Sequence, residues 1–325
     1  MAQPSQVQVH LDAILTNISV AFIQNQNNFI ANKVFPIVPV NKQTNKYYTY
    51  TRPDWFRDEA QQRADATESV GSGYGLSTDS YSCDVFAIHK DVGYQTRANA
   101  DEPLDLDREA VLFVTQRLLL RQEIQWVTDY FTTGVWTTDK TGVSASPSGS
   151  QFIQWSDYVN SDPLTDVENG KSTILSTTGY EANTLVLGYD VFRYLKNHPD
   201  MVDRTKYTSS AVITTELLAA LFGVERVIVA KAVKATSNEG ATATYAFTHG
   251  KAAWLGYVAP NPGLLTPSAG YTFAWNGVSG GLGANVGIGR IPVPLHKADR
   301  IEGEVAFDNK VVSADLGFFF ASATV

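Results

Sequence analysis

Three short fragments of the chain contain residue types whose spacing could support chemistry. The segment 277–281 (Gly-Val-Ser-Gly-Gly) matches the nucleophile elbow of serine hydrolases, with Ser279 as the nucleophile and His296 and Asp299 as candidate partners. A nucleophile elbow needs a helix after the serine, whereas the residues that follow Ser279 are rich in glycine. His296 also precedes Asp299, the reverse of the usual order. We therefore keep the serine-hydrolase function only as an alternative, and two features of the sequence argue against it.

The other two fragments resemble nucleotide-binding loops. Gly170-Lys171-Ser172 would need a glycine five positions before Gly170, where Thr165 stands, and the triplet falls inside a predicted helix. The glycines between 281 and 287 are spaced one residue too widely for a dinucleotide fingerprint. The five histidines are scattered, and no pair has metal-ligand spacing. The sequence therefore predicts no catalytic residue, no cofactor and no metal site.

The composition is that of a folded protein without disulfides. The 325 residues are 44% hydrophobic and 18% charged, with a net charge of −8 and one cysteine, Cys83, which we expect to be buried in a strand. No apolar run is long enough for a transmembrane helix, and residues 1–11 lack the early Lys or Arg of a signal peptide. The acidic balance argues against a sequence-specific nucleic-acid-binding protein, which would carry a clustered basic face.

The elements that must position these residues begin with an extended segment and an overlong hairpin. Pro36 and Pro39 forbid a central strand and favour extended chain near residue 37. Residues 46–52 and 80–92 are predicted strands, and about 27 residues rich in charge and glycine connect them. Because hairpin connections usually have 2–5 residues, this connection is either a binding loop or an arm that packs elsewhere.

Residues 104–133 form the strongest predicted helix. Acidic residues precede it and Gly134 would end it, which suits the helix dipole and a C-terminal stop. At 1.5 Å per residue the helix would be roughly 45 Å long, a spine across the molecule. The face predicted to be buried comprises Leu106, Ala110, Phe113, Leu120, Ile124, Val127 and Phe131.

The rest of the chain predicts a mixed α+β protein. The pattern Thr165-Asp-Val-Glu168 is a capping box that would open a helix to about residue 178, and residues 137–150 read as a surface loop. Two shorter helices are expected at 191–197, with Asp190 as its cap, and at 217–222, with Gly223 as its stop. Strands are expected at 184–187, 224–230, 243–248, 252–258, 271–275, 301–307 and 310–320.

Four segments resemble the major capsid proteins of tailed bacteriophages, which have the Hong Kong 97-like capsid fold. They are Asp162-Pro-Leu-Thr-Asp-Val-Glu168, the block from Asn183 to Pro199, Lys206-Tyr207, and the block from Leu221 to Val229. The resemblance covers roughly residues 20–325. It implies a shell protein that forms pentamers and hexamers around packaged double-stranded DNA. An encapsulin-type bacterial compartment, which encloses enzyme instead, is the alternative within the same fold.

The resemblance also implies a domain organisation and a set of partners. The expected segments are an N-terminal arm (1–45), an extended hairpin loop (46–95), the spine helix and peripheral domain (96–159), an axial domain (160–289) and peripheral-domain strands (290–325). The expected partners are other copies of the chain, a separate scaffolding protein, a portal and a possible decoration protein, with non-specific proximity to DNA and no membrane. The expected location is the virion, with assembly in the host cytoplasm.

The extended loop and the arm supply the candidate contacts between subunits. The interleaved charges between residues 52 and 68 are either a solvated surface or a segment that meets opposite charges on a neighbour, and composition leaves both open. Some family members cross-link subunits through a lysine in this loop. Because no lysine lies between Tyr47 and His89, we expect no such link. The candidate contact residues are Phe35, Arg52, Trp55, Arg57, Asp58, Glu59, Arg63 and Glu68.

Overall fold

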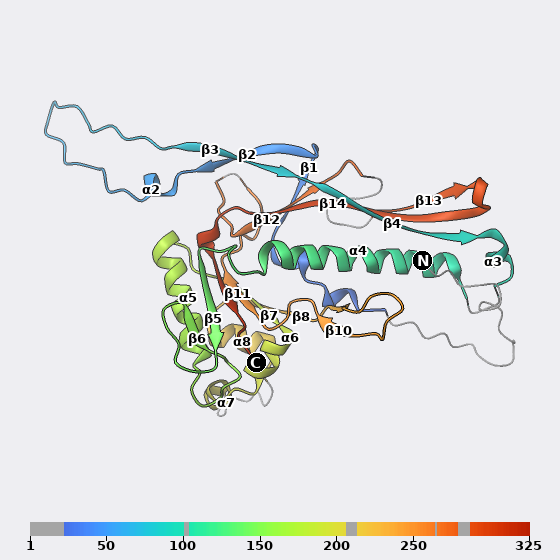
Figure 1. Ribbon diagram of the computed structural model, residues 1–325. Helices are drawn as coiled ribbons and strands as arrows, with labels where there is room; N and C mark the ends of the chain where they lie inside the picture. The colour runs from blue at the N-terminus through green and yellow to red at the C-terminus, as the bar shows by residue number, and fades with distance from the viewer. Residues whose placement is uncertain (1–22, 101–103, 206–212, 264, 279–286) are drawn as a thin grey trace.

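The fold consists of two β-sheets with one long helix, α4, running between them. The computed structural model describes residues 23–100, 104–205, 213–263, 265–278 and 287–325. Figure 1 shows α4 as a spine, with a five-stranded sheet above it and a six-stranded sheet and several helices below it. No helix of the described segments is long and apolar enough to cross a membrane.

The upper sheet is organised around its longest strand, β14 (Ala298–Val311). Strand β4 pairs antiparallel along one side of β14, while β13 and then β12 pair antiparallel along its other side. Strand β1 lies at the edge, parallel to β12, where a strand tolerates the missing N–H of Pro39. The bounds of these partners are β1 Ile37–Val40, β4 Asp84–Gly93, β12 Gly270–Trp275 and β13 Gly287–Val293.

The lower sheet has the order β6-β5-β15-β11-β7-β8. Its strands are β5 Thr138–Val143, β6 Gln151–Ile153, β7 Thr184–Gly188, β8 Arg226–Ala230, β11 Ala253–Gly256 and β15 Gly317–Ala321. The expected surface loop at 137–150 was therefore wrong in part, because β5 pairs in parallel with the buried β15. The segment 290–325 contributes strands to both sheets, since the chain leaves the upper sheet after β14 and enters the lower one as β15.

Four helices accompany the lower sheet, and their ends test the predicted caps. Helix α5 begins at the N-cap Asp162, whose carboxylate accepts the N–H of Thr165 at 3.1 Å, so the capping box at Thr165 was wrong by one turn. Gly223 ends α8 in the left-handed region (φ 60°), as predicted. Asp190 lies inside α6 and not at its cap. The helices are α5 Pro163–Thr178, α6 Tyr189–Lys196, α7 Pro199–Thr205 and α8 Thr215–Phe222.

The spine helix α4 (Leu106–Tyr130) has 25 residues, five fewer than predicted, and it ends four residues before Gly134, the predicted stop. Its buried face also differs from the predicted one. The buried positions recur every fourth residue: Leu106, Ala110, Val114, Leu118, Gln122, Trp126 and Tyr130, with Glu123 beside them. A step of four residues advances about 40° beyond a full turn, so this stripe winds around the helix. It winds because α4 packs on the upper sheet near Val114 and on the main core near Trp126. Phe113, predicted to be buried, is exposed.

The main core is an aromatic cluster at the C-terminal end of α4. Phe35 lies at its centre, with ring centroids 4.4 Å from Tyr130, 5.2 Å from Trp254 and 6.0 Å from Trp126. Only 2% of Phe35 is exposed, so the expectation that it contacts another subunit is corrected: its own chain already surrounds the ring. The arm therefore contributes to the subunit's own core at this point.

The remaining elements are short. Strands β9 and β10 form a separate two-stranded ladder, and β2 and β3 form the hairpin described below. Their bounds, with those of the short helices, are η1 Gln26–Asn28, α1 Ala31–Val34, β2 Thr44–Tyr50, α2 Arg52–Trp55, β3 Leu76–Ser82, α3 Tyr94–Ala98, β9 Val233–Ala235, β10 Tyr245–Phe247, η2 Pro294–His296 and η3 Ala314–Leu316.

Candidate interaction surfaces

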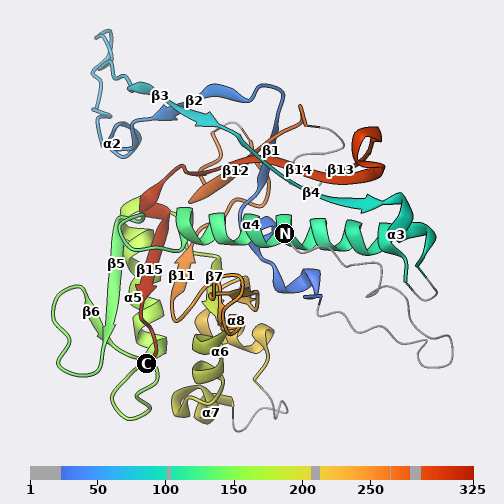
Figure 2. The same cartoon turned by 45° about the vertical axis from the view of Figure 1, so that its right-hand side comes forward.

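Strands β2 and β3 form a two-stranded hairpin that projects beyond both sheets. They pair antiparallel from Thr44 opposite Ser82 to Tyr50 opposite Leu76, and residues 51–75 connect them. In Figures 1 and 2 this hairpin and its connection extend away from α4 and from the lower sheet. The overlong hairpin expected from the sequence is therefore present, but its second strand is β3 at 76–82. Most of the predicted strand 80–92 is instead β4, which pairs with β14 of the upper sheet. Neither of the large sheets contains β2 or β3.

Exposed aromatic side chains gather where the connection leaves the hairpin. The ring centroid of Trp55 lies 5.4 Å from that of Tyr74 and 6.2 Å from that of Tyr50. Trp55 is 57% exposed and Tyr74 is 63% exposed. We call Tyr50, Trp55 and Tyr74 the hairpin aromatic cluster. Because folded monomers rarely expose contiguous apolar patches without a use for them, this cluster is a candidate contact surface.

The base of the connection is held in place by polar contacts. Arg52 forms an ion pair with Asp315 at 2.5 Å, which joins the connection to η3 of the body. The carboxylate of Asp54 accepts the N–H of Gly75 at 2.8 Å, which closes the neck of the loop. The aromatic cluster is thus presented from a fixed base.

The predicted charged contacts lie mainly on this connection. Arg57 lies 3.4 Å from Asp54 and 3.9 Å from Glu59, and Glu59 accepts a hydrogen bond from Ser72. Asp58, Arg63 and Glu68 are all exposed to solvent. Some charges of the loop therefore pair with each other, and contact with a neighbouring subunit stays a prediction.

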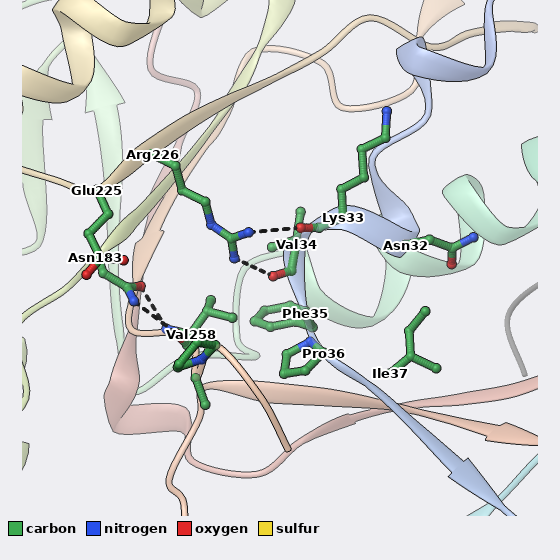
Figure 3. A pocket seen from close by; sticks show the side chains of 12 residues that line it. Asn32, Lys33, Val34, Phe35, Pro36, Ile37, Asn183, Glu225, Arg226 and Val258 are labelled. Carbon is green, nitrogen blue, oxygen red and sulfur yellow. Dashed lines mark hydrogen bonds between the residues drawn. The ribbon is translucent and has the colours of Figure 1, made fainter. Parts of the chain in front are cut away.

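A hollow of about 430 Å³ lies where the arm crosses the lower sheet (Figure 3). The guanidinium of Arg226 points at the arm there and donates to the carbonyl oxygens of Val34 at 2.8 Å and Lys33 at 3.2 Å. Its Nε donates to the hydroxyl of Thr184 at 3.0 Å. All three of its nitrogens thus bind the chain itself, so Arg226 holds the arm against β7 and β8.

A buried carboxylic acid also holds the arm, and no sequence signal pointed to it. Oε2 of Glu123 accepts the N–H groups of Ile30 and Ala31, each at 2.9 Å, at the start of α1. Burial raises the pKa of Glu123 to about 7, although both hydrogen bonds favour the charged form. Burial also lowers the pKa of His249, which lies beside it, to about 3.

The candidate catalytic residues do not assemble into a described site. Ser279 lies outside the described residues. The carboxylate of Asp299 binds Arg97 at 2.8 Å and also Arg290, and these two cations lower its pKa. His296 is exposed on η2. Among the described residues, no group of three or more His, Cys, Asp or Glu side chains could hold a metal ion.

Two other sequence expectations can be compared with the structure. The triplet 170–172 lies inside α5, where a phosphate-binding loop cannot form. Cys83 is fully buried between β3 and β4, as expected, and burial raises the pKa of its thiol to about 12.

Comparison with known proteins supplies the remaining evidence. No family model matches the chain. The major capsid protein of Burkholderia phage BcepMu is 25% identical over 245 residues, which cover 74% of each protein. A phage-related protein from Bordetella bronchiseptica RB50 is 25% identical, with a TM-score of 0.67 over 92% of this chain and 94% of its own.

Two more solved structures share the fold at low sequence identity. The capsid of cyanophage P-SCSP1u is 9% identical and superposes with a TM-score of 0.64 over 98% of both chains. The SrpI encapsulin of Synechococcus elongatus PCC 7942 is 12% identical, with a TM-score of 0.56 over 97% of this chain and 92% of its own. Likeness at these identities concerns the fold alone.

Proposed function

We propose that the chain is a shell protein of the tailed-bacteriophage major capsid type, with the Hong Kong 97-like fold. Its likeness to the major capsid protein of phage BcepMu and the fold it shares with solved capsid structures support this proposal. We propose that it assembles into pentamers and hexamers of an icosahedral shell that encloses double-stranded DNA. Each contact in a closed shell is repeated by symmetry, so modest energies per contact suffice.

One observation carries this proposal: the projecting hairpin presents an aromatic cluster that its own subunit does not cover. Trp55 and Tyr74 are large side chains of the kind that dominate the energetics of protein interfaces. The ion pair of Arg52 with Asp315 fixes the direction in which the hairpin points. A neighbouring copy of the chain is the partner that a symmetric shell places against it.

The segments then have the following roles in the proposal. Residues 1–45 are the arm, 46–95 the extended loop, 96–159 the spine helix and peripheral domain, 160–289 the axial domain and 290–325 peripheral strands. The C-terminal segment contributes β14 to the upper sheet and β15 to the lower sheet, so these domains are interwoven. A separate scaffolding protein, a portal and a decoration protein are the proposed partners. The shell belongs to the virion and assembles in the host cytoplasm, and the chain itself has no catalytic role.

Substitution of the aromatic cluster tests the proposal. Trp55→Ser combined with Tyr74→Ser should abolish shell formation and leave the subunit folded, because neither ring belongs to a buried cluster. Tyr245→Ser is the matched control, since Tyr245 is 70% exposed on β10, away from the hairpin. Sedimentation separates shells from subunits, and circular dichroism reports folding. Normal shells from the double variant would refute the role of the cluster.

An encapsulin-type compartment is the second candidate, and it is favoured by the fold shared with the SrpI encapsulin. The two functions differ in cargo and not in the shell. Mass spectrometry and nuclease digestion of purified particles separate them: nucleic acid supports the capsid, and a stoichiometric enzyme without nucleic acid supports the compartment.

A further inference from the structure

The exposed face of the spine helix has an unusual charge pattern. Six residues of α4 are exposed, and every charged one among them is an arginine: Arg108, Leu112, Phe113, Arg117, Arg121 and Thr128. The whole chain has a net charge of −8, so this pattern runs against the composition. At about 100° per residue, Arg108 lies about 180° around the helix from Arg117, whereas Arg117 and Arg121 lie on the same side. We call Arg117 and Arg121 the arginine row.

Aromatic rings hold this charge in place. The guanidinium carbon of Arg117 lies 5.1 Å from the ring centroid of Phe113, and the ammonium of Lys90 on β4 lies 5.6 Å from the same ring. The guanidinium of Arg121 lies 4.7 Å from the ring of Phe86. Rings attract cations through their faces without neutralising them. Phe113 is thus exposed on the helix because it carries two cations.

Three of the four acidic residues of α4 are occupied elsewhere. Asp107 binds Arg97 at 2.7 Å, and Glu123 is buried beneath the arm. Asp129 accepts hydrogen bonds from Gln125 and Asn309, each at 2.9 Å. Glu109, half-buried near the start of the helix, occupies the position one turn before Phe113.

The cations of the row keep their charge available. Within the described segments, no ion pair within 4.0 Å involves the arginine row or Lys90. The side-chain hydrogen bond of the row runs from Arg121 to the neutral amide of Gln125, at 2.8 Å. These N–H donors can therefore bind an external anion.

We propose that the arginine row, together with Lys90, binds the phosphodiester backbone of double-stranded nucleic acid without reading its sequence. From Arg117 to Arg121 the row spans about 6 Å along the helix axis, which matches about two phosphates of one strand at 3.4 Å along the axis. Arginine presents planar donors that suit phosphate oxygens. The proposal rests on the proposed function, because it identifies the face of the shell subunit that meets DNA.

The overall negative charge of the chain weakens the proposed contact. A net charge of −8 repels DNA at long range, and two or three phosphate contacts are few for a nucleic-acid-binding protein. Weak contacts with DNA suit a shell that must later release its DNA.

Binding of the full-length, unassembled chain to a fluorescent 30-base-pair duplex tests the proposal. Arg117→Gln with Arg121→Gln should reduce affinity on the order of ten-fold per arginine at 50 mM salt and lower the slope of log affinity against log salt by about two. Arg117→Lys with Arg121→Lys keeps the charges and should restore most of the slope. Arg193→Gln is the matched control, because Arg193 is also exposed and lies 5.0 Å from the ring of Tyr194.

Three results would overturn the proposal: no binding by the parent chain at 50 mM salt, equal loss in the Arg193→Gln control, or an unchanged slope in the double glutamine variant. Two duplexes of unrelated sequence should bind equally, and a strong preference for one would also contradict it. Electron microscopy of the same preparations keeps the two proposals apart. If the parent chain forms shells but the arginine substitutions leave its DNA affinity unchanged, only this inference is refuted. If the parent chain forms no shells, the proposed function is refuted.

Discussion

Oε1 of Glu123 lies 3.6 Å from Nδ1 of His249, and both side chains are completely buried. The two residues come from the spine helix and from the turn before β11, and they lie beneath the start of α1 in the arm. Burial disfavours both charged forms, so the pKa of Glu123 is raised to about 7 and that of His249 is lowered to about 3. The start of α1 therefore packs on Glu123 and His249, which are both uncharged near pH 5.

The first prediction concerns the pH dependence of stability. The pKa of Glu123 rises from 4.5 to about 7 on folding, so the folded chain binds this proton more tightly. Its contribution to the free energy of unfolding must then fall by about 3 kcal/mol as the pH rises from 4.5 through 7. Glu123→Gln cannot ionise, and its amide oxygen can accept the same two N–H groups. The variant should gain about 3 kcal/mol relative to the parent between pH 4.5 and pH 8 in urea denaturation.

The comparison must separate Glu123 from its buried neighbour. The lowered pKa of His249 makes stability fall as the pH drops below 6.5, but this loss occurs in both proteins and cancels in the difference. Lys33 contributes a smaller attraction to the carboxylate. A difference between variant and parent that stays constant with pH would contradict the account.

The second prediction concerns the contact of α4 with the upper sheet. A Cβ atom on Gly303 of β14 would lie 2.5 Å from Cγ1 of Val114 and 2.8 Å from Cδ1 of Leu118. Gly303→Ala should therefore lower the free energy of unfolding by about 1–3 kcal/mol, because the helix must shift to admit the methyl group. Gly289→Ala on the neighbouring β13 is the matched control, since its Cβ meets nothing within 4 Å. Equal stability of the two variants would show that α4 packs less closely than described.

The spine helix shows what local sequence can and cannot predict. Its existence follows from the acidic residues before it and from the spacing of its apolar residues, although it ends at Tyr130, before the predicted stop at Gly134. Its buried face does not, because the face winds as α4 passes from the upper sheet to the main core. Phe113 looks like a core residue by type, and only its two cationic neighbours, one of them from β4, explain its exposure.

The candidate contacts show the same limit. The overlong hairpin was predictable from two strand patterns and the length between them. Phe35 was predicted to meet a neighbour because it lies on an extended arm, yet its ring packs among Trp126, Tyr130 and Trp254 from three distant parts of the chain. Such convergence depends on tertiary packing, which residue type and spacing do not reveal.

The third prediction concerns covalent links in the mature shell. No lysine lies between Tyr47 and His89, so the projecting part of the extended loop cannot supply the lysine of an isopeptide bond. The single cysteine, Cys83, is fully buried. Denaturing gels of mature particles should show one band at the mass of the chain, with and without reductant. A ladder of multimers that survives boiling would refute this prediction.

Electron microscopy of the expressed 325-residue chain, alone and with the proposed scaffolding protein, tests the central claim most directly. The account predicts closed icosahedral particles in which the hairpin aromatic cluster lies against a neighbouring subunit. A chain that remains a 35.5 kDa monomer under both conditions would contradict the assignment of this protein as a shell subunit.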